Sequence, residues 1–130
     1  MDRNEIAALG ASLRPIDQKF LKKKVNIQRV WYQGEESYFD VFFEIQNHQI
    51  VWFQFTLRGK VLIWERENSA FQTGETNEFY LPDQTYYSAS KLIHQDSKPD
   101  LDFIQLVQSI LQTRTGEEIF DRALALFKDK

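Results

Sequence analysis

The chain has 130 residues, of which 42% are hydrophobic and 15% aromatic, and its formal net charge is −3. This composition is typical of a globular protein and excludes a disordered chain, and the length corresponds to one domain over residues 1–130. The absence of cysteine excludes disulfides, thiolate metal sites and cysteine catalysis. The apolar run at residues 6–9 is too short for a signal peptide, and no stretch approaches the roughly 20 apolar residues of a membrane span. We therefore expect a cytoplasmic protein that makes no membrane contact.

Residues 2–24 are predicted to be helical, with a break at Pro15 that ends a first helix near Leu13 and begins a second one. Three consecutive lysines at residues 22–24 could contact a nucleic acid or an acidic partner. Because the pI is near 5.4, we interpret them instead as the end of a helix, where cations interact favourably with the helix dipole. No nucleic-acid partner is expected.

The next part of the chain is rich in aromatic residues that alternate with polar ones. This period-two pattern, with β-branched and aromatic residues, predicts four strands at residues 25–33, 37–46, 49–57 and 60–67. The connections between them are short, so the strands should form an antiparallel meander.

The pairing of the second and third strands follows from burial. A loop of only two residues at 47–48 would pair Phe43 with Trp52 and mix the two faces, whereas a three-residue loop would pair Phe43 with Phe53. We favour the second arrangement, because it gives one continuous apolar face. The turn at residues 58–59 could be tight or bulged, and its type decides whether Ile63 or Trp64 joins the opposite face.

Residues 68–96 form an irregular excursion in this prediction. Residues 73–74 and 82–83 carry turn signals, residues 79–81 could form an edge strand, and residues 86–94 a short helix or strand. So long a segment without structure is uncommon in a compact domain, which favours either unrecognised elements or a functional loop.

Two helices are predicted at the C-terminal end. Ser97 is expected to cap the first, with Asp100 completing a capping box, and this helix should run to about Gln112. Thr115 is expected to cap the second, and both helices carry an apolar stripe suited to covering the sheet. The predicted architecture is therefore α+β: an N-terminal helix, a four-stranded antiparallel meander, an irregular excursion and two C-terminal helices packed on the sheet.

No catalytic, metal-binding or cofactor-binding motif stands out. His94 could act as a general base oriented by Asp96, but no nucleophile lies at a recognisable spacing. Asp40 and Glu44 share a strand face about 13 Å apart, too far to act on one bond. We expect no metal and no cofactor, and an enzyme is not favoured.

The second face of the predicted sheet is unusually aromatic. Tyr38, Phe42 and Trp52 should point away from the core, together with Ile50 and with Trp64 or Ile63. Either residues 68–96 or the N-terminal helix cover this face, or it forms a groove for a peptide, a partner protein or a small ligand.

Two functional hypotheses follow. The first is a non-enzymatic binding module that engages a protein or peptide through the aromatic sheet face. The alternative is a small-molecule-binding pocket protein, or a small enzyme, with its site between the sheet and residues 68–96 and with His94 or Glu78 in the lining. The candidate binding residues are Tyr38, Phe42, Trp52, Trp64 and His94.

Overall fold

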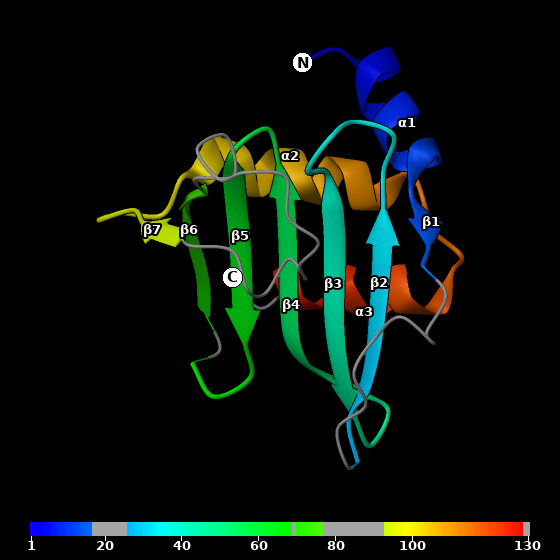
Figure 1. The fold of residues 1–130 in the computed structure, drawn as a ribbon, viewed down its shortest axis with the longest axis vertical. Helices are drawn as coiled ribbons and strands as arrows, with labels where there is room; N and C mark the ends of the chain where they lie inside the picture. The colour runs from blue at the N-terminus through cyan, green and yellow to red at the C-terminus, as the bar shows by residue number, and fades with distance from the viewer. Residues whose placement is uncertain (17–25, 69, 77–92, 129–130) are drawn as a thin grey trace.

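The computed structural model describes residues 1–16, 26–68, 70–76 and 93–128, and these form a seven-stranded antiparallel sheet with three helices. The strands lie in the sheet in the order in which they occur along the chain (Figure 1). The elements are α1 (Arg3–Ser12), β1 (Arg14–Pro15), β2 (Gln28–Gln33), β3 (Asp40–Gln46), β4 (Gln49–Leu57), β5 (Lys60–Glu65), β6 (Ala70–Thr76), β7 (Ile93–Gln95), α2 (Leu101–Gln112) and α3 (Glu118–Phe127). None of the helices in these ranges is long and apolar enough to cross a membrane.

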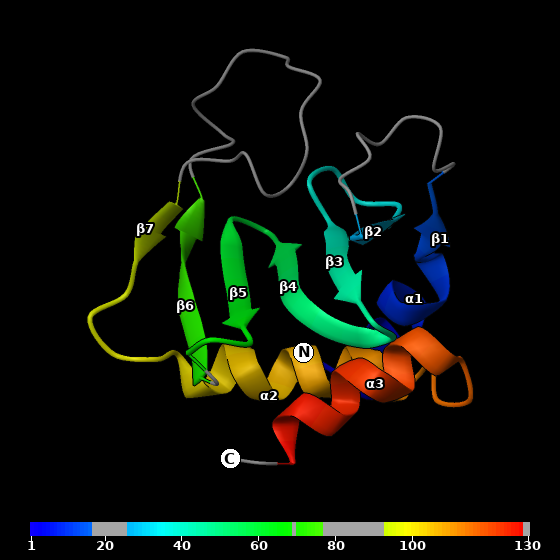
Figure 2. The same cartoon turned by 90° about the horizontal axis from the view of Figure 1, so that it is seen from below.

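The α2 and α3 helices lie on the same side of the sheet (Figure 2). We call this side the helix face and the opposite side the second face. The α+β class and the four strands β2 to β5 confirm the prediction, but the sheet is larger than predicted.

The additional strands come from segments that were expected to be helix or turn. Arg14–Pro15 pairs with β2, and the amide of Ile16 donates to the Trp31 carbonyl oxygen at 2.8 Å, so the chain leaves α1 as a strand. The turn predicted at residues 73–74 is wrong, because both residues lie within β6, where Gly74 is paired with Val61 and with Gln95. The predicted lysine-rich helix, the edge strand at 79–81 and most of the element at 86–94 lie outside the described residues.

The β3–β4 pairing has the predicted register, since Val41 lies opposite Phe55 and Phe43 opposite Phe53. The turn itself differs from the prediction: Asn47 and His48 form a tight turn, with φ angles of 52° and 65°. The register shifts between Glu44 and Ile45, which leaves Val51 as an extra residue in β4. This bulge lets a tight turn coexist with a matched apolar face.

The β4–β5 connection is also tight, with positive φ at both Arg58 and Gly59. The register places Trp64 opposite Phe53, on the helix face, and Ile63 opposite Gln54, on the second face. The alternative left open by the sequence is thus resolved in favour of Ile63.

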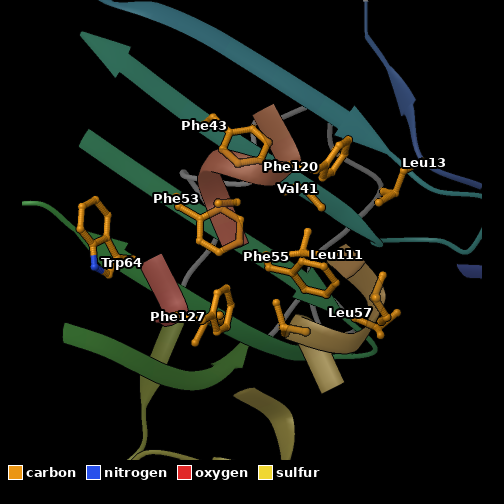
Figure 3. Close-up of a cluster of buried hydrophobic side chains, with 14 of the residues drawn as sticks. Leu13, Val41, Phe43, Phe53, Phe55, Leu57, Trp64, Leu111, Phe120 and Phe127 are labelled. Atoms are coloured by element: carbon orange, nitrogen blue, oxygen red, sulfur yellow. The ribbon is translucent and has the colours of Figure 1, made fainter. Parts of the chain in front are cut away.

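The hydrophobic core lies between the helix face and the two C-terminal helices (Figure 3). Phe43 and Phe53 stack with ring centroids 5.3 Å apart, and Phe120 from α3 meets Phe43 edge-on at 6.2 Å. The predicted apolar stripe of α2 is confirmed, since its inward residues are all buried: Phe103, Val107, Ile110 and Leu111.

Both C-terminal helices begin later than predicted. Asp100, not Ser97, caps α2, and its Oδ1 accepts from the Phe103 amide at 3.1 Å. The reason is Pro99, which disfavours a helical conformation at the residue before it. Thr115 does not cap α3, because Gly116, with a φ of 103°, lies between Thr115 and the start of the helix. The Thr115 hydroxyl donates to the Gln112 carbonyl oxygen instead.

Candidate binding face on the second side of the sheet

The second face consists of three rows of side chains that run across the strands. Because alternate residues of a strand point to opposite sides, the residues between the core positions all face this way. The central row contains Trp31, Phe42, Gln54, Ile63 and Gln72, which are successive partners from β2 to β6. The row toward the 58–59 turn contains Gln33, Asp40, Thr56, Val61 and Gly74, and the row toward the 47–48 turn contains Arg29, Glu44, Trp52, Glu65 and Ala70.

The middle of this face is closed to solvent, although no helix of the described ranges lies against it. Gln54 and Thr56 are 0% exposed and Phe42 is 2% exposed. Trp31 and Trp52, by contrast, are half-buried. The face is therefore not a solvated sheet surface, and the two tryptophans mark its accessible part.

The central strand β4 presents hydrogen-bonding side chains at successive second-face positions. Trp52, Gln54 and Thr56 are two residues apart, which corresponds to about 7 Å for each step. The indole Nε1 of Trp52 and the hydroxyl of Thr56 are buried, and neither has a hydrogen-bond partner among the described residues. An unmade hydrogen bond of this kind typically costs about 1–3 kcal/mol.

The charged groups of this face are mostly acidic. Arg29 Nε donates to Glu44 Oε2 at 3.0 Å, and both side chains are largely buried. Glu65 lies on the other side of Trp52 from Glu44. Asp40, 4% exposed, is the partner of Thr56 on the neighbouring strand. Among the residues that the structure describes, the three rows thus contain one cation and three carboxyl groups.

The structure brings together only some of the residues predicted for the site. Phe42 and Trp52 lie on the second face as expected. Tyr38 is half-buried just before β3, with φ of 61°, and is not part of the three rows. Trp64 lies in the core cluster on the helix face, 9% exposed, so it does not join Phe42 and Trp52 (Figure 3).

His94 is also separate from that group. It lies in β7 opposite Glu75, three strands away from β4 in the sheet. Asp96, its proposed orienting partner, accepts a hydrogen bond from the Thr73 hydroxyl at 2.8 Å. The carboxylate of Asp96 therefore helps to join the end of β7 to β6.

Sequence reasoning offered Ile63 only as an alternative to Trp64, and it did not identify Trp31, Asp40, Gln54 or Thr56 as site residues. The alternation along β4 already placed Gln54 and Thr56 on this face, but as wetted polar residues. Their complete burial was the missing information, and no sequence signal distinguishes a buried polar strand residue from an exposed one.

A cleft of about 510 Å³ opens on another side of the molecule, between α1, the 58–59 turn and α2. Ile6, Leu57 and Leu106 line it, with Arg58 and Lys60 at the rim. Arg58 pairs with Glu36 and Glu5, and its hydrogen bonds hold the pKa of Glu36 below its usual value. Lys60 pairs with Asp100 at 3.2 Å. The cations of this cleft already have acidic partners.

A second hollow of about 810 Å³ lies beside the 47–48 turn, where Val30, Ile45 and Ile119 meet Arg122. The guanidinium of Arg122 donates to the His48 carbonyl oxygen and pairs with Glu118. In the part of the chain that the structure describes, no group of three or more His, Asp or Glu side chains could hold a metal ion.

No known protein family, no curated protein and no solved structure matches this chain. Its function must therefore be inferred from the chemistry of its own surfaces.

Proposed function

We propose that this protein is a non-enzymatic binding module and that the second face of its sheet is the binding surface. The observation that carries this proposal is the pair of buried polar groups on β4, the Trp52 indole N–H and the Thr56 hydroxyl, that have no hydrogen-bond partner among the described residues. Such groups are uncommon in native proteins and call for a specific explanation. A bound molecule that completes the hydrogen bonds of these two groups would provide that explanation.

The surroundings of these groups suit a binding site. Phe42, Val61 and Ile63 provide buried apolar surface beside Thr56 and Gln54. Ligand sites in proteins are commonly apolar with a few polar groups that fix the orientation of the ligand. The second face has this composition.

The same residues argue against catalysis. Asp40 and Glu44 are four residues apart on β3, about 13 Å, which is too far for a carboxyl pair that acts on one bond. Glu44 is also engaged by Arg29. The Thr56 hydroxyl has no hydrogen-bonded base among the described residues, so nothing there activates it as a nucleophile.

A protein or peptide partner is the second candidate, and the half-buried state of Trp31 and Trp52 favours it. Aromatic anchors commonly dominate the binding energy of protein interfaces. The closed centre of the face, however, leaves a macromolecule only the row toward the 47–48 turn.

A thermal-shift screen against a metabolite library, run beside a pull-down from lysate, tests the proposal. Gln54→Met changes the centre of the second face, and Gln105→Met makes the same substitution at an exposed position on α2. Ligands or partners that bind wild type should lose binding to Gln54→Met and keep it with Gln105→Met. Binding that survives Gln54→Met but is lost in Leu106→Gln would place the site in the cleft beside α1 and contradict the proposal.

A further inference from the structure

We propose that the groove between α1 and α2 is a docking site for an amphipathic helix of a partner protein. The partner helix has an apolar stripe, an acidic residue near its N-terminus and a basic residue near its C-terminus, and it lies antiparallel to α2. The residues that line the groove are all different from those of the three rows on the second face, so this inference does not depend on the proposed function.

The groove lies between two helices that are in contact at one end. Gly10 of α1 lies so close to Thr113 at the end of α2 that a Cβ atom on the glycine would be 1.8 Å from the threonine hydroxyl oxygen. The two helices run in different directions (Figure 1). The cleft of about 510 Å³ and a second hollow of about 380 Å³ open between them, and Ile6 and Ser109 line both. The two hollows therefore form one continuous groove.

Apolar side chains from three elements meet in this groove. Ile6 comes from α1, Leu57 from the end of β4, and Leu106 from α2. Phe103 also lines the cleft and belongs to the hydrophobic core. Apolar side chains of a partner that enter the cleft are therefore removed from water, which favours binding.

Two strongly exposed apolar side chains border the same cleft. Among the residues that the structure describes, the exposed large hydrophobic side chains are Met1, 50% exposed, and Leu101, 71% exposed. Met1 lines the cleft, and Leu101 lies one turn before Gln105, which also lines it. Apolar surface that gathers at one place in this way is typical of an interaction site. Because Leu101 is outside the cleft, a small molecule would leave it in water, whereas a protein partner would cover it.

The groove has the length of a short helix. The α2 residues Asp102, Leu106, Ser109 and Thr113 line it, and their three-or-four spacing places them in one stripe. From Asp102 to Thr113 this stripe is about 16 Å long, or about three helical turns. Helices that dock in grooves present apolar anchors at the same spacing. The groove thus fits a partner helix of about three turns that packs alongside α2.

Two unpaired charges near the ends of the groove set the direction of the partner helix. Asp102, in the first turn of α2, and Arg3, which lines the second hollow beside Thr113, are exposed and have no ion-pair partner among the described residues. The other cations at the rim already have acidic partners. Acidic residues stabilise the N-terminal end of a helix and basic residues its C-terminal end. The N-terminal end of the partner helix therefore lies over Arg3 and its C-terminal end over Asp102, which makes it antiparallel to α2.

A phage-displayed library of helical peptides about 14 residues long tests this inference without knowledge of the partner. The peptides have an alanine-rich frame that is randomised along one face and at both ends. Selection uses the full chain, and clones that also bind Leu106→Gln or Leu101→Ser are removed. We expect enriched peptides with apolar residues at three-and-four spacing, an acid near the N-terminus and a lysine or arginine near the C-terminus. A selection that yields no peptide specific for wild type would overturn the proposal.

Calorimetric titration of the consensus peptide then tests the groove residue by residue. Leu106→Gln should weaken binding at least tenfold, whereas Leu126→Gln, at a half-buried position on α3, should not change it. Asp102→Asn should weaken binding about threefold, the loss expected for an exposed ion pair, and Glu67→Gln should not. Leu101→Ser should also weaken binding about threefold. Because Leu101 is so exposed, its variant keeps the test valid even where Leu106→Gln does not fold.

A nitroxide label on the C-terminus of the peptide tests the direction of binding. It should broaden the amide signal of Asp102 more than that of Thr113, and the opposite result would show that the partner helix is not antiparallel to α2.

The remaining outcomes separate this inference from the proposed function. The peptide should bind Gln54→Met as tightly as wild type. A peptide that loses binding to Gln54→Met and keeps it with Leu106→Gln binds the second face, which contradicts this inference and supports the proposed function. Sedimentation that shows wild type, but not Leu101→Ser, to self-associate would assign the groove to a second copy of the chain and contradict a partner helix. Equal affinity for wild type, Leu106→Gln and Leu101→Ser would show that the peptide does not bind the groove and would overturn the proposal.

Discussion

Arg114 binds the end of α1 through Gly10, 104 residues earlier in the chain: its Nη1 donates to the Gly10 carbonyl oxygen at 2.9 Å. The same nitrogen donates to the Leu13 carbonyl oxygen at 2.8 Å, and the guanidinium lies 5.0 Å from the centre of the Phe120 ring. Arg114 Nη2 donates to Glu117 Oε1, and this pairing raises the pKa of Arg114. One side chain thus joins α1 to the α2–α3 connection.

Replacing Arg114 should therefore destabilise the whole fold. We expect Arg114→Met to lower the free energy of unfolding by roughly 2–3 kcal/mol, since it removes charge-assisted hydrogen bonds from carbonyl groups at a helix end. Urea unfolding monitored by circular dichroism measures this. Arg3→Met, an exposed arginine on α1, is the control and should change stability by less than about 0.5 kcal/mol. Equal stability of the two variants would mean that Arg114 does not hold α1.

Gly10 allows α1 to approach α2 closely. A Cβ atom at this position would lie 1.8 Å from Thr113 Oγ1 and 3.0 Å from Thr113 Cβ, so Gly10→Ala should force the helices apart. We expect a loss of about 1–3 kcal/mol, typical of overpacking. In a double-mutant cycle, Thr113→Gly removes the two nearest contacting atoms, leaves the Ile110 carbonyl oxygen at 3.2 Å, and should recover most of the loss. Additive effects of the two substitutions would show that the contact is not made.

The stacked pair of Phe43 and Phe53 defines the centre of the core. Phe53 is 0% exposed, so Phe53→Ala should cost roughly 3–5 kcal/mol by leaving a cavity. Val51→Ala, at the half-buried bulged position of the same strand, should cost less than about 1 kcal/mol. A small loss for Phe53→Ala would contradict the assignment of the helix face.

Asp100 should make stability depend on pH. The Phe103 amide, and secondly Lys60, hold the pKa of Asp100 below its ordinary value. A carboxyl group with a lowered folded-state pKa stabilises the protein above its unfolded-state pKa, about 4, and this contribution is lost as the pH falls through the folded-state pKa. Asparagine also caps helices well, so Asp100→Asn removes mainly the charge.

Melting temperatures of wild type and Asp100→Asn should therefore differ at neutral pH, with wild type higher, and converge once the pH has fallen below the lowered folded-state pKa of Asp100. Glu67→Gln, at an exposed position after β5, gives the baseline for a change of net charge alone. A difference between wild type and Asp100→Asn that is constant from neutral to acidic pH would rule out the charge of Asp100 as its cause.

The parts of the fold that follow from local patterns were predictable. The alternation correctly predicted that Val41, Phe43, Phe53 and Phe55 face the helices, and the preference for one apolar face gave the pairing of Phe43 with Phe53. Its assignment of Ile50 to the second face is wrong, because the bulge at Val51 shifts the alternation and places Ile50 in the core. The bulge at Val51 was not predictable, because a tight turn with an extra strand residue and a longer loop give the same pairing. Gly74 was taken as a turn residue because glycine favours turns, but pairing on both sides holds it in β6.

The starts of α2 and α3 also could not be predicted from local sequence patterns alone. Ser97 and Thr115 match capping patterns in the sequence, yet Pro99 and Gly116 move the actual starts toward the C-terminus. Because Thr115 does not cap α3, we expect Thr115→Ala to change the free energy of unfolding by less than about 0.5 kcal/mol. The candidate site was predicted through Phe42 and Trp52, but the role of Thr56 depends on burial in three dimensions, which period-two alternation does not report.

The most direct test of the binding face is the indole region of a ¹H–¹⁵N correlation spectrum. The chain has three tryptophans, and their signals can be assigned with the Trp31→Phe, Trp52→Phe and Trp64→Phe variants. On titration with a ligand or partner found by the screen, the Trp52 indole signal should shift saturably as its N–H gains an acceptor, with a smaller shift at Trp31. The signal of Trp64, in the core on the opposite face, should stay in place. A saturable ligand that leaves Trp52 unshifted would contradict the account.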